Sequence, residues 1–153
     1  MIRGLAPECP VIDLCHTIEP GNVHRAAFVL EAAAPDFPPG AIHLAVVDPG
    51  VGTERRALVV AAREQVFVGP DNGILEWALS APGARAHELA DERWFRTPVS
   101  RTFHGRDVFA PVAAHLALGV PIDRLGPAVA DPMRLPRPPL RVVDGRLEGR
   151  VMY

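Results

Sequence analysis

A chain of 153 residues has the length of about one domain, and its 48% apolar and 22% charged residues are typical of a globular protein. The formal net charge of −2 argues against nucleic acid or an anionic membrane as the main partner, because both attract a basic surplus. No run approaches the roughly 18 apolar residues of a membrane span, and the N-terminus lacks a secretory signal pattern. A cytoplasmic protein is therefore expected.

The first quarter of the chain predicts one strand and one helix. The run VIDL at residues 11–14 is short, apolar and preceded by Pro10, which is typical of a buried strand. Asn22 is a favourable N-cap for the helix that follows, and this helix should end before Pro35. The apolar positions of the helix fall on one face and are Val23, Ala26, Ala27 and Leu30.

The middle of the chain alternates strand-like and helix-like stretches. Apolar runs predict strands over residues 42–47, 57–62, 66–68 and 85–89, and a short helix over residues 74–79. A longer helix is predicted over residues 105–118, with Gly119 as its C-terminal stop. Pro111 fits this helix best in its first turn, where a missing N–H group costs least.

This alternation predicts an α/β fold in which a mostly parallel sheet has helices on both faces. Residues 1–131 are expected to form the α/β domain. Residues 132–139 are rich in proline, which is typical of a linker. Residues 140–153 predict the first hairpin of a C-terminal β domain, with its turn at Asp144 and Gly145.

Ligands bind to open α/β sheets where strands end and helices begin. Asp48 follows one predicted strand, Asp71 and Asn72 follow another, and His104 opens a predicted helix. Asp48 follows a predicted strand in the stretch VVDPGVGTERRALVV, whose glycines allow the chain to fold back and bring Arg55 to Asp48. An arginine beside a carboxylate keeps it ionised and fixes its direction. His104 opens the predicted helix over residues 105–118, where the helix dipole favours a neutral imidazole. Such an acid–arginine–histidine set is suited to activating water, but it does not identify the electrophile.

Other interpretations of these residues stay open at this point. Asp48 precedes a proline and is compatible with an ordinary turn, and a lone histidine is more often structural than catalytic. His104, Asp107 and His115 also allow a metal-dependent hydrolase, although their spacing matches no tight ligand pattern. The sequence does not decide whether Asp48 or His104 takes a proton from water.

Three stretches together resemble one family: HLAVVDPGVGTERR at residues 43–56, FVGPDNGIL at 67–75 and TFHGRDVFAPVAAHLALGVP at 102–121. This combination is similar to the S-adenosyl-L-methionine hydrolases, also called SAM hydroxide adenosyltransferases, which are related to the fluorinating and chlorinating enzymes. The resemblance extends from about residue 9 to the end of the chain. It implies a fluorinase-like N-terminal domain and attack of an activated water on the ribose C5′ of S-adenosylmethionine, giving adenosine and L-methionine. No cofactor is implied, because S-adenosylmethionine is the substrate.

The resemblance also assigns site residues. It implies that Asp48, Arg55 and His104 act on the nucleophilic water, and the presence of all three favours water over halide. By the same resemblance, the ribose and the methionine part are bordered by Thr102, Phe103 and Gly105. Asn72 is expected to line the same cleft.

Relatives of this kind have an acidic loop and a first strand that precede the region matched here, and a C-terminal β domain that follows it. Their pocket forms between neighbouring subunits of a trimer. The expectation is therefore a homotrimer in the full-length form. This chain is then a truncated copy that carries the water-activating half of the site. The alternative is an inactive or binding-only fragment of such an enzyme.

Overall fold

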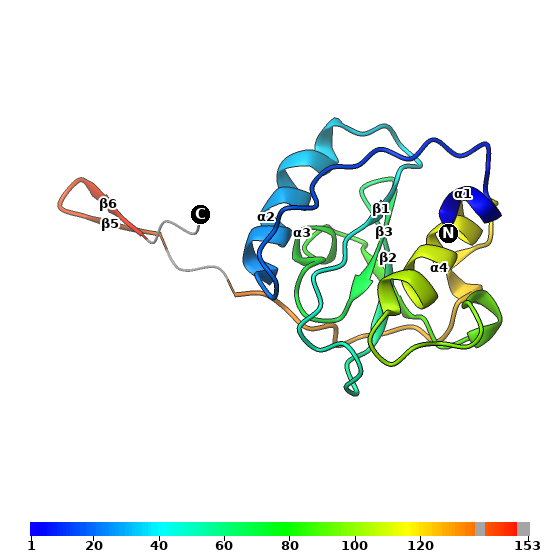
Figure 1. Cartoon of the computed structure of the whole chain (residues 1–153). Helices are drawn as coiled ribbons and strands as arrows, with labels where there is room; N and C mark the ends of the chain where they lie inside the picture. The colour runs from blue at the N-terminus through cyan, green and yellow to red at the C-terminus, as the bar shows by residue number, and fades with distance from the viewer. Residues whose placement is uncertain (137–139, 150–153) are drawn as a thin grey trace.

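The computed structural model describes residues 1–136 and 140–149, which form a mixed α/β domain followed by a small hairpin that lies apart from it (Figure 1). The helices are α1 (Ile2–Leu5), α2 (Val23–Ala33), α3 (Glu76–Leu79) and α4 (Ala110–Ala117). The strands are β1 (Ile42–Leu44), β2 (Ala57–Ala62), β3 (Gln65–Pro70), β4 (Arg85–Glu88), β5 (Arg141–Val143) and β6 (Arg146–Glu148). Short 3₁₀ turns occur at Ala34–Asp36, Glu92–Trp94 and Ile122–Arg124, and a π turn at Gly105–Phe109 precedes α4.

The sheet of the domain is mixed, in the order β1-β3-β2-β4. β1 pairs with β3 in parallel, whereas β2 pairs antiparallel with both β3 and β4. The expectation of a mostly parallel sheet is therefore wrong for these strands. The physical reason is the connection between β2 and β3, which is a tight hairpin through Arg63 and Glu64 (φ 54° and 60°) and not a helical crossover.

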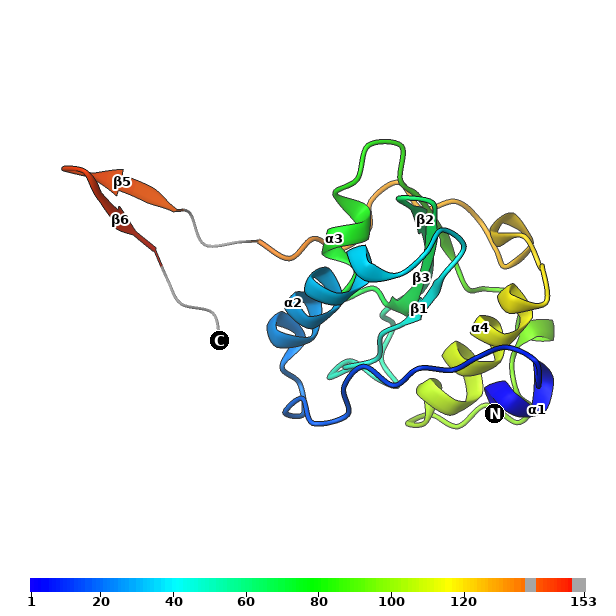
Figure 2. The same cartoon turned by 90° about the horizontal axis from the view of Figure 1, so that it is seen from above.

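Apolar side chains of β2 point alternately to two sides of the sheet, and helices cover each side (Figure 2). Leu58 and Val60 pack with α2 and α3, whereas Val59 packs with the π turn and α4. Because the strand ends and the π turn are both anchored in this core, the loops between them are held in place. The candidate site lies on these loops.

Both longer helices form where the sequence predicts, but the predicted helix over residues 105–118 begins as a π turn, and α4 starts only at Ala110. The side chain of Asn22 accepts a hydrogen bond from the backbone N–H of Arg25 at 3.0 Å, and α2 gives way to a 3₁₀ turn at Pro35. Pro111 lies in the first turn of α4. None of the helices in the described residues combines the length and hydrophobicity needed to cross a bilayer.

The strand predicted over residues 11–14 does not form. This segment runs over the surface between α1 and α2, and Ile12 is 67% exposed. A strand requires a neighbouring strand for its backbone hydrogen bonds, and no strand among the described residues pairs with this segment. The apolar pattern therefore predicted a buried strand, although no neighbouring strand or core covers this segment among the described residues.

The C-terminal hairpin turns where it was expected to. β5 and β6 pair antiparallel around Asp144 and Gly145, which have φ values of 49° and 72°. The hairpin side chains are exposed. Residues 137–139 of the expected linker and residues 150–153 of the expected hairpin lie outside the described residues. The division into domain, linker and second domain stays a prediction.

We expect the stability of the chain to fall as the pH drops below about 6.5 because of His43. This residue is buried on β1, stacks on Phe67 and lies 3.2 Å from Gln65 Oε1. Burial lowers the pKa of His43, so the unfolded chain takes up the proton first and is stabilised as the pH falls. Urea unfolding should give a lower midpoint at pH 5 than at pH 7.5. A His43→Gln variant should narrow that difference, and an unchanged difference would contradict the assignment.

Candidate active site

A glycine-rich bend places Asp48, which follows β1, beside Arg55, which precedes β2. Within the bend, Gly50 O accepts hydrogen bonds from Thr53 N at 3.1 Å and from Thr53 Oγ1 at 2.7 Å. Gly52 has a φ of +79°, and a Cβ atom there would lie 2.7 Å from the carbonyl oxygen of Arg101. Glycine is thus required at residue 52 by conformation and by close approach of another loop.

Asp48 and Arg55 form a nearly buried ion pair. Arg55 Nε lies 3.0 Å from Oδ1 and 2.9 Å from Oδ2 of Asp48, and Arg55 Nη2 also donates to Oδ2. The side chains of Arg55 and Asp48 are only 10% and 5% exposed. The predicted contact between this acid and this arginine is therefore confirmed. The ring of Phe109 lies 5.2 Å from Arg55 Cζ and covers the guanidinium.

His104 joins this pair through Arg55, at a distance of 2.9 Å between Arg55 Nη2 and His104 Nδ1. A guanidinium only donates hydrogen bonds, so Nδ1 accepts, and the proton of the neutral ring is on Nε2. The pKa of His104 is lowered by burial and by the positive charge of Arg55, against the opposing effect of Asp48 and Asp107. The lowered pKa favours the neutral imidazole at pH 7, and its Nε2–H group is a hydrogen-bond donor.

The π turn at Gly105–Phe109 determines how His104 enters the site, because His104 is the residue from which the turn begins. Phe103 O accepts hydrogen bonds from the backbone N–H groups of Arg106 and Asp107, at 3.0 and 2.9 Å. π turns are rare and occur frequently at functional sites. The sequence predicted an ordinary helix over residues 105–118, and no motif in it identifies the π turn.

Asn72 supports the site from the end of β3. Its Nδ2 donates to Val47 O at 2.9 Å, and its Oδ1 accepts from Ile74 N at 3.1 Å. The amide thereby fixes the carbonyl group that directly precedes Asp48. The role expected for Asn72 in lining a cleft stays a prediction.

Asp71, which precedes Asn72, was expected at the end of a strand but was assigned no role, and it is a supporting residue of the site. Its buried carboxylate accepts from Arg56 Nε at 2.8 Å and from the backbone N–H of Met133 at 2.7 Å. Asp71 thereby connects the strand end near the site to the chain segment after α4. The only sequence signal is its position beside Asn72 at the end of an apolar run.

Thr102 and Phe103 lie on the loop that leads into His104, and Gly105 is the first residue of the π turn that follows it. Phe103 is 59% exposed, and its ring lies 5.0 Å from the guanidinium carbon of Arg106. Thr102 is exposed, and a Cβ atom added to Gly105 would make only an ordinary contact with Val46 at 3.7 Å. Their proximity to His104 follows from the sequence itself, and their contact with a substrate stays a prediction.

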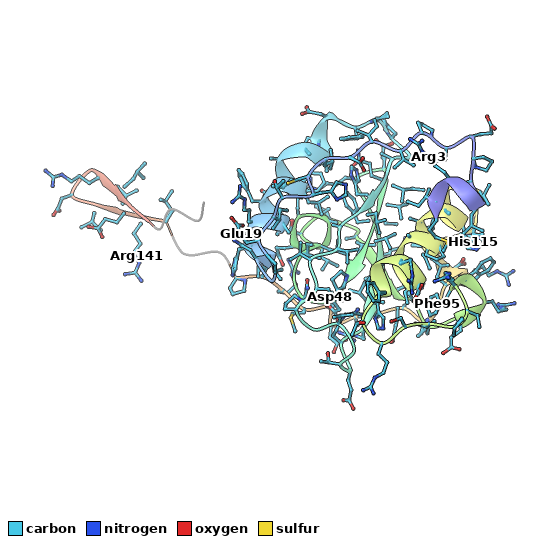
Figure 3. The ribbon with its side chains drawn as sticks, viewed as in Figure 1. Arg3, Glu19, Asp48, Phe95, His115 and Arg141 are labelled. Carbon is cyan, nitrogen blue, oxygen red and sulfur yellow. The ribbon has the colours of Figure 1, made fainter. Side chains whose placement is uncertain are left out.

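The structure contradicts the alternative of a metal site made by His104, Asp107 and His115. Asp107 is fully buried and bound by two arginines and a backbone N–H group, and the ring of His115 packs against Trp94 at 5.1 Å. His115 lies well away from Asp48 in Figure 3. Throughout residues 1–136 and 140–149, no three His, Cys, Asp or Glu side chains are arranged to hold a metal ion.

Replacing Gly52 by alanine should lower the free energy of unfolding by more than about 1–3 kcal/mol, the usual cost of a non-glycine residue in a strained left-handed conformation, because the added Cβ atom would also meet Arg101 O. Gly83→Ala is a matched control, because Gly83 also has a positive φ (+73°) but an added Cβ atom would meet nothing within 4 Å. Urea unfolding should therefore show a larger loss for Gly52→Ala. Equal losses would mean that the approach of Arg101 to the bend has no energetic weight.

The fold and the site together define a mixed α/β domain with a carboxylate–guanidinium–imidazole array at its strand ends. Residues 1–126 match the profile of the SAM hydroxide adenosyltransferase N-terminal domain, and the chain belongs to this family. It is 52% identical over 151 residues to an (R)-S-adenosyl-L-methionine hydrolase of Salinispora tropica, covering 97% of this chain and 57% of that protein. The predicted family resemblance is therefore confirmed.

More distant relatives and solved structures agree with this family. A fluorinase of Nocardia brasiliensis is 26% identical over 155 residues, with 86% of this chain and 52% of that protein covered. The crystal structure of an uncharacterized conserved protein from Thermotoga maritima has a TM-score of 0.88 and 42% identity, covering 94% of this chain and 56% of that one. The chain thus spans little more than half the length of these relatives.

Proposed function

We propose that this chain carries the water-activating part of an enzyme that hydrolyses S-adenosyl-L-methionine to adenosine and L-methionine. The observation that carries the proposal is the direct contact of His104 with Arg55, which in turn binds Asp48. Relatives named (R)-S-adenosyl-L-methionine hydrolase, with identities of 52% and 48%, support the choice of substrate. The fluorinase-like character of the domain is part of the same proposal.

The reaction requires help for the nucleophile and not for the leaving group. A bond forms between the water oxygen and C5′ while the bond between C5′ and the sulfonium breaks. The electron pair of that bond remains on sulfur, which leaves as a neutral thioether and needs no acid. Water must be aimed in line with the breaking bond and must lose a proton, and these two requirements are met by orientation and by a positioned base.

The hydrogen bonds of the site support a division of these tasks. Because Nδ1 of His104 accepts from Arg55, the Nε2–H group can donate to the oxygen of the water and orient it. The proton of the water then goes to Asp48, whose carboxylate has acceptor capacity beyond the bonds from Arg55. Arg55 joins both residues and fixes the imidazole tautomer. No cofactor takes part in this scheme.

The remaining part of the site is proposed to come from sequence that relatives carry beyond the matched region. In the full-length form we propose a cytoplasmic homotrimer in which a neighbouring subunit completes the pocket. Asn72, Thr102, Phe103 and Gly105 would border the substrate on this side. Sedimentation analysis tests the oligomer, and a monomer at all accessible concentrations would contradict it.

Hydrolysis is tested by incubating the protein with S-adenosylmethionine in H₂¹⁸O and analysing adenosine by liquid chromatography and mass spectrometry. The expected product is adenosine with one ¹⁸O atom at its 5′ position, formed in equal amount with methionine. Adenosine without the label would contradict direct attack by water. If a version as long as the relatives forms no adenosine above the buffer control, the proposed function is wrong.

A binding-only role is the second candidate, because the chain spans 57% of the length of its hydrolase relative from Salinispora tropica. In that case calorimetry should detect binding of adenosine to this chain, while the assay in labelled water detects no turnover. Turnover by this chain would exclude the binding-only role.

A further inference from the structure

Asp107 is a fully buried carboxylate that the proposed chemistry does not use. It lies in the π turn, three residues after His104. Its Oδ1 accepts from Arg96 Nη1 at 3.1 Å and from Arg106 Nε at 2.7 Å. Its Oδ2 accepts from Ser100 N at 2.9 Å and from Arg106 Nη2 at 2.8 Å. Donors of the protein occupy both oxygens, so the carboxylate acts on the structure around it and not on a ligand.

These bonds attach the loop before His104 to the π turn after it. The backbone N–H of Arg96 donates to the carbonyl oxygen of Asp107 at 2.8 Å, and the carboxylate holds the backbone of Ser100. Asp107 thus holds the loop at two places, four residues apart. The next residue, Arg101, brings its carbonyl group against Gly52 in the bend that carries Asp48 and Arg55. One loop therefore contacts the bend and also leads into His104.

The positive charges around Asp107 help to keep His104 neutral. Arg96 and Arg106, whose side chains are 43% and 48% exposed, balance the buried negative charge. Without them, Asp107 would favour an imidazolium, because its charge raises the pKa of His104. The other charged groups that act on His104 are Arg55 and Asp48. A protonated Nδ1 could not accept the hydrogen bond from Arg55, so this balance protects the contact.

We propose that Asp107 is a positioning residue, which joins the loop over residues 96–103 to the π turn and so holds His104 against Arg55. The catalytic meaning of this inference rests on the proposed function. The contact itself does not, and a measurement on the free protein reports it. Asp107 touches no reacting atom and would act only through His104.

The test is ¹⁵N NMR of the His104 imidazole in the wild-type chain and in Asp107→Asn. The wild type should show one tautomer, with the proton on Nε2. In the variant, the N–H₂ group of the new asparagine cannot accept the hydrogen bonds that Asp107 accepts. The loop over residues 96–103 should then be held less firmly, and both tautomers of His104 should be populated. Asp91→Asn is the matched control, because it removes an exposed aspartate–arginine pair with Arg93, and its His104 signals should equal those of the wild type. Wild-type signals in folded Asp107→Asn would overturn the proposal.

A second variant decides the question even if Asp107→Asn does not fold. Arg106→Gln changes a half-exposed side chain and leaves the charge of Asp107 less balanced. NMR titration should then show a raised pKa of His104. The kcat of S-adenosylmethionine hydrolysis should fall, and the acidic limb of its pH–rate profile should move to higher pH. If Asp107 and Arg106 only stabilised the fold, the variant would lower the rate without moving the acidic limb of the pH–rate profile. An unchanged titration of His104 in Arg106→Gln would overturn the proposal. Failure of hydrolysis alone would contradict the proposed function and leave the NMR result standing.

Discussion

Replacing His104 by alanine should slow the formation of adenosine from S-adenosylmethionine by at least about 100-fold, the lower end of what a positioned proton-transfer or orienting group supplies. The alanine variant loses both the donor that aims the water and the acceptor that holds Arg55 Nη2. The substitution should leave the fold intact, because His104 stands at the start of the π turn and is only partly buried. Initial rates of adenosine formation under saturating substrate measure the effect.

His104→Gln distinguishes a donor from a base at this position. A glutamine side chain donates through its amide but takes up no proton near neutral pH. If His104 orients water through Nε2–H, the glutamine variant should recover part of the rate lost in the alanine variant. A glutamine variant as slow as alanine would favour His104 as the base and contradict the role given to Asp48. His115→Gln is the matched control, because His115 packs on Trp94 away from the site and its loss should leave the rate unchanged.

The sequence was sufficient wherever the deciding interactions are local. The cap at Asn22 and the proline in the first turn of α4 depend on residues within one turn, and both formed as predicted. The contact of Asp48 with Arg55 is also local, since Arg55 follows Asp48 by seven positions and two glycines lie between them. The contact with His104 spans 49 residues. The positions at strand ends and at a helix start suggested that these residues form one set, and the family resemblance assigned all three to the same water molecule.

The predictions that were wrong have a common physical cause, because each depended on which parts of the chain lie next to one another in the fold. The turn through Arg63 and Glu64 carries neither glycine nor asparagine at its positive φ positions, so nothing in the sequence indicated the antiparallel pairing of β2 and β3. The apolar run at residues 11–14 has no partner strand in the described residues, and apolar pattern does not report the presence of a neighbour. Asp107 was considered as a metal ligand because sequence spacing cannot show the two arginines that bind it.

Removing the carboxylate of Asp48 should cost about 3–5 kcal/mol of folding free energy, because it leaves the charge of Arg55 nearly buried without its partner. That is a large fraction of the 5–15 kcal/mol typical of a small domain. The measurement is urea unfolding of Asp48→Ala, with Arg93→Met as the control. The control breaks an exposed ion pair, for which about 1 kcal/mol or less is expected.

The double variant Asp48→Ala with Arg55→Met tests the reason for that loss. If the cost comes from an unpaired buried charge, removing both charges should destabilise the chain less than Asp48→Ala alone, because an apolar side chain can pack against Phe109 in place of the guanidinium. The double variant should also have lost hydrolysis, since His104 no longer has a donor for Nδ1. Additive costs of the two single variants would mean that Asp48 and Arg55 act independently. The proposal that Arg55 couples the carboxylate of Asp48 to the imidazole of His104 would then be wrong, despite the short distances between these groups.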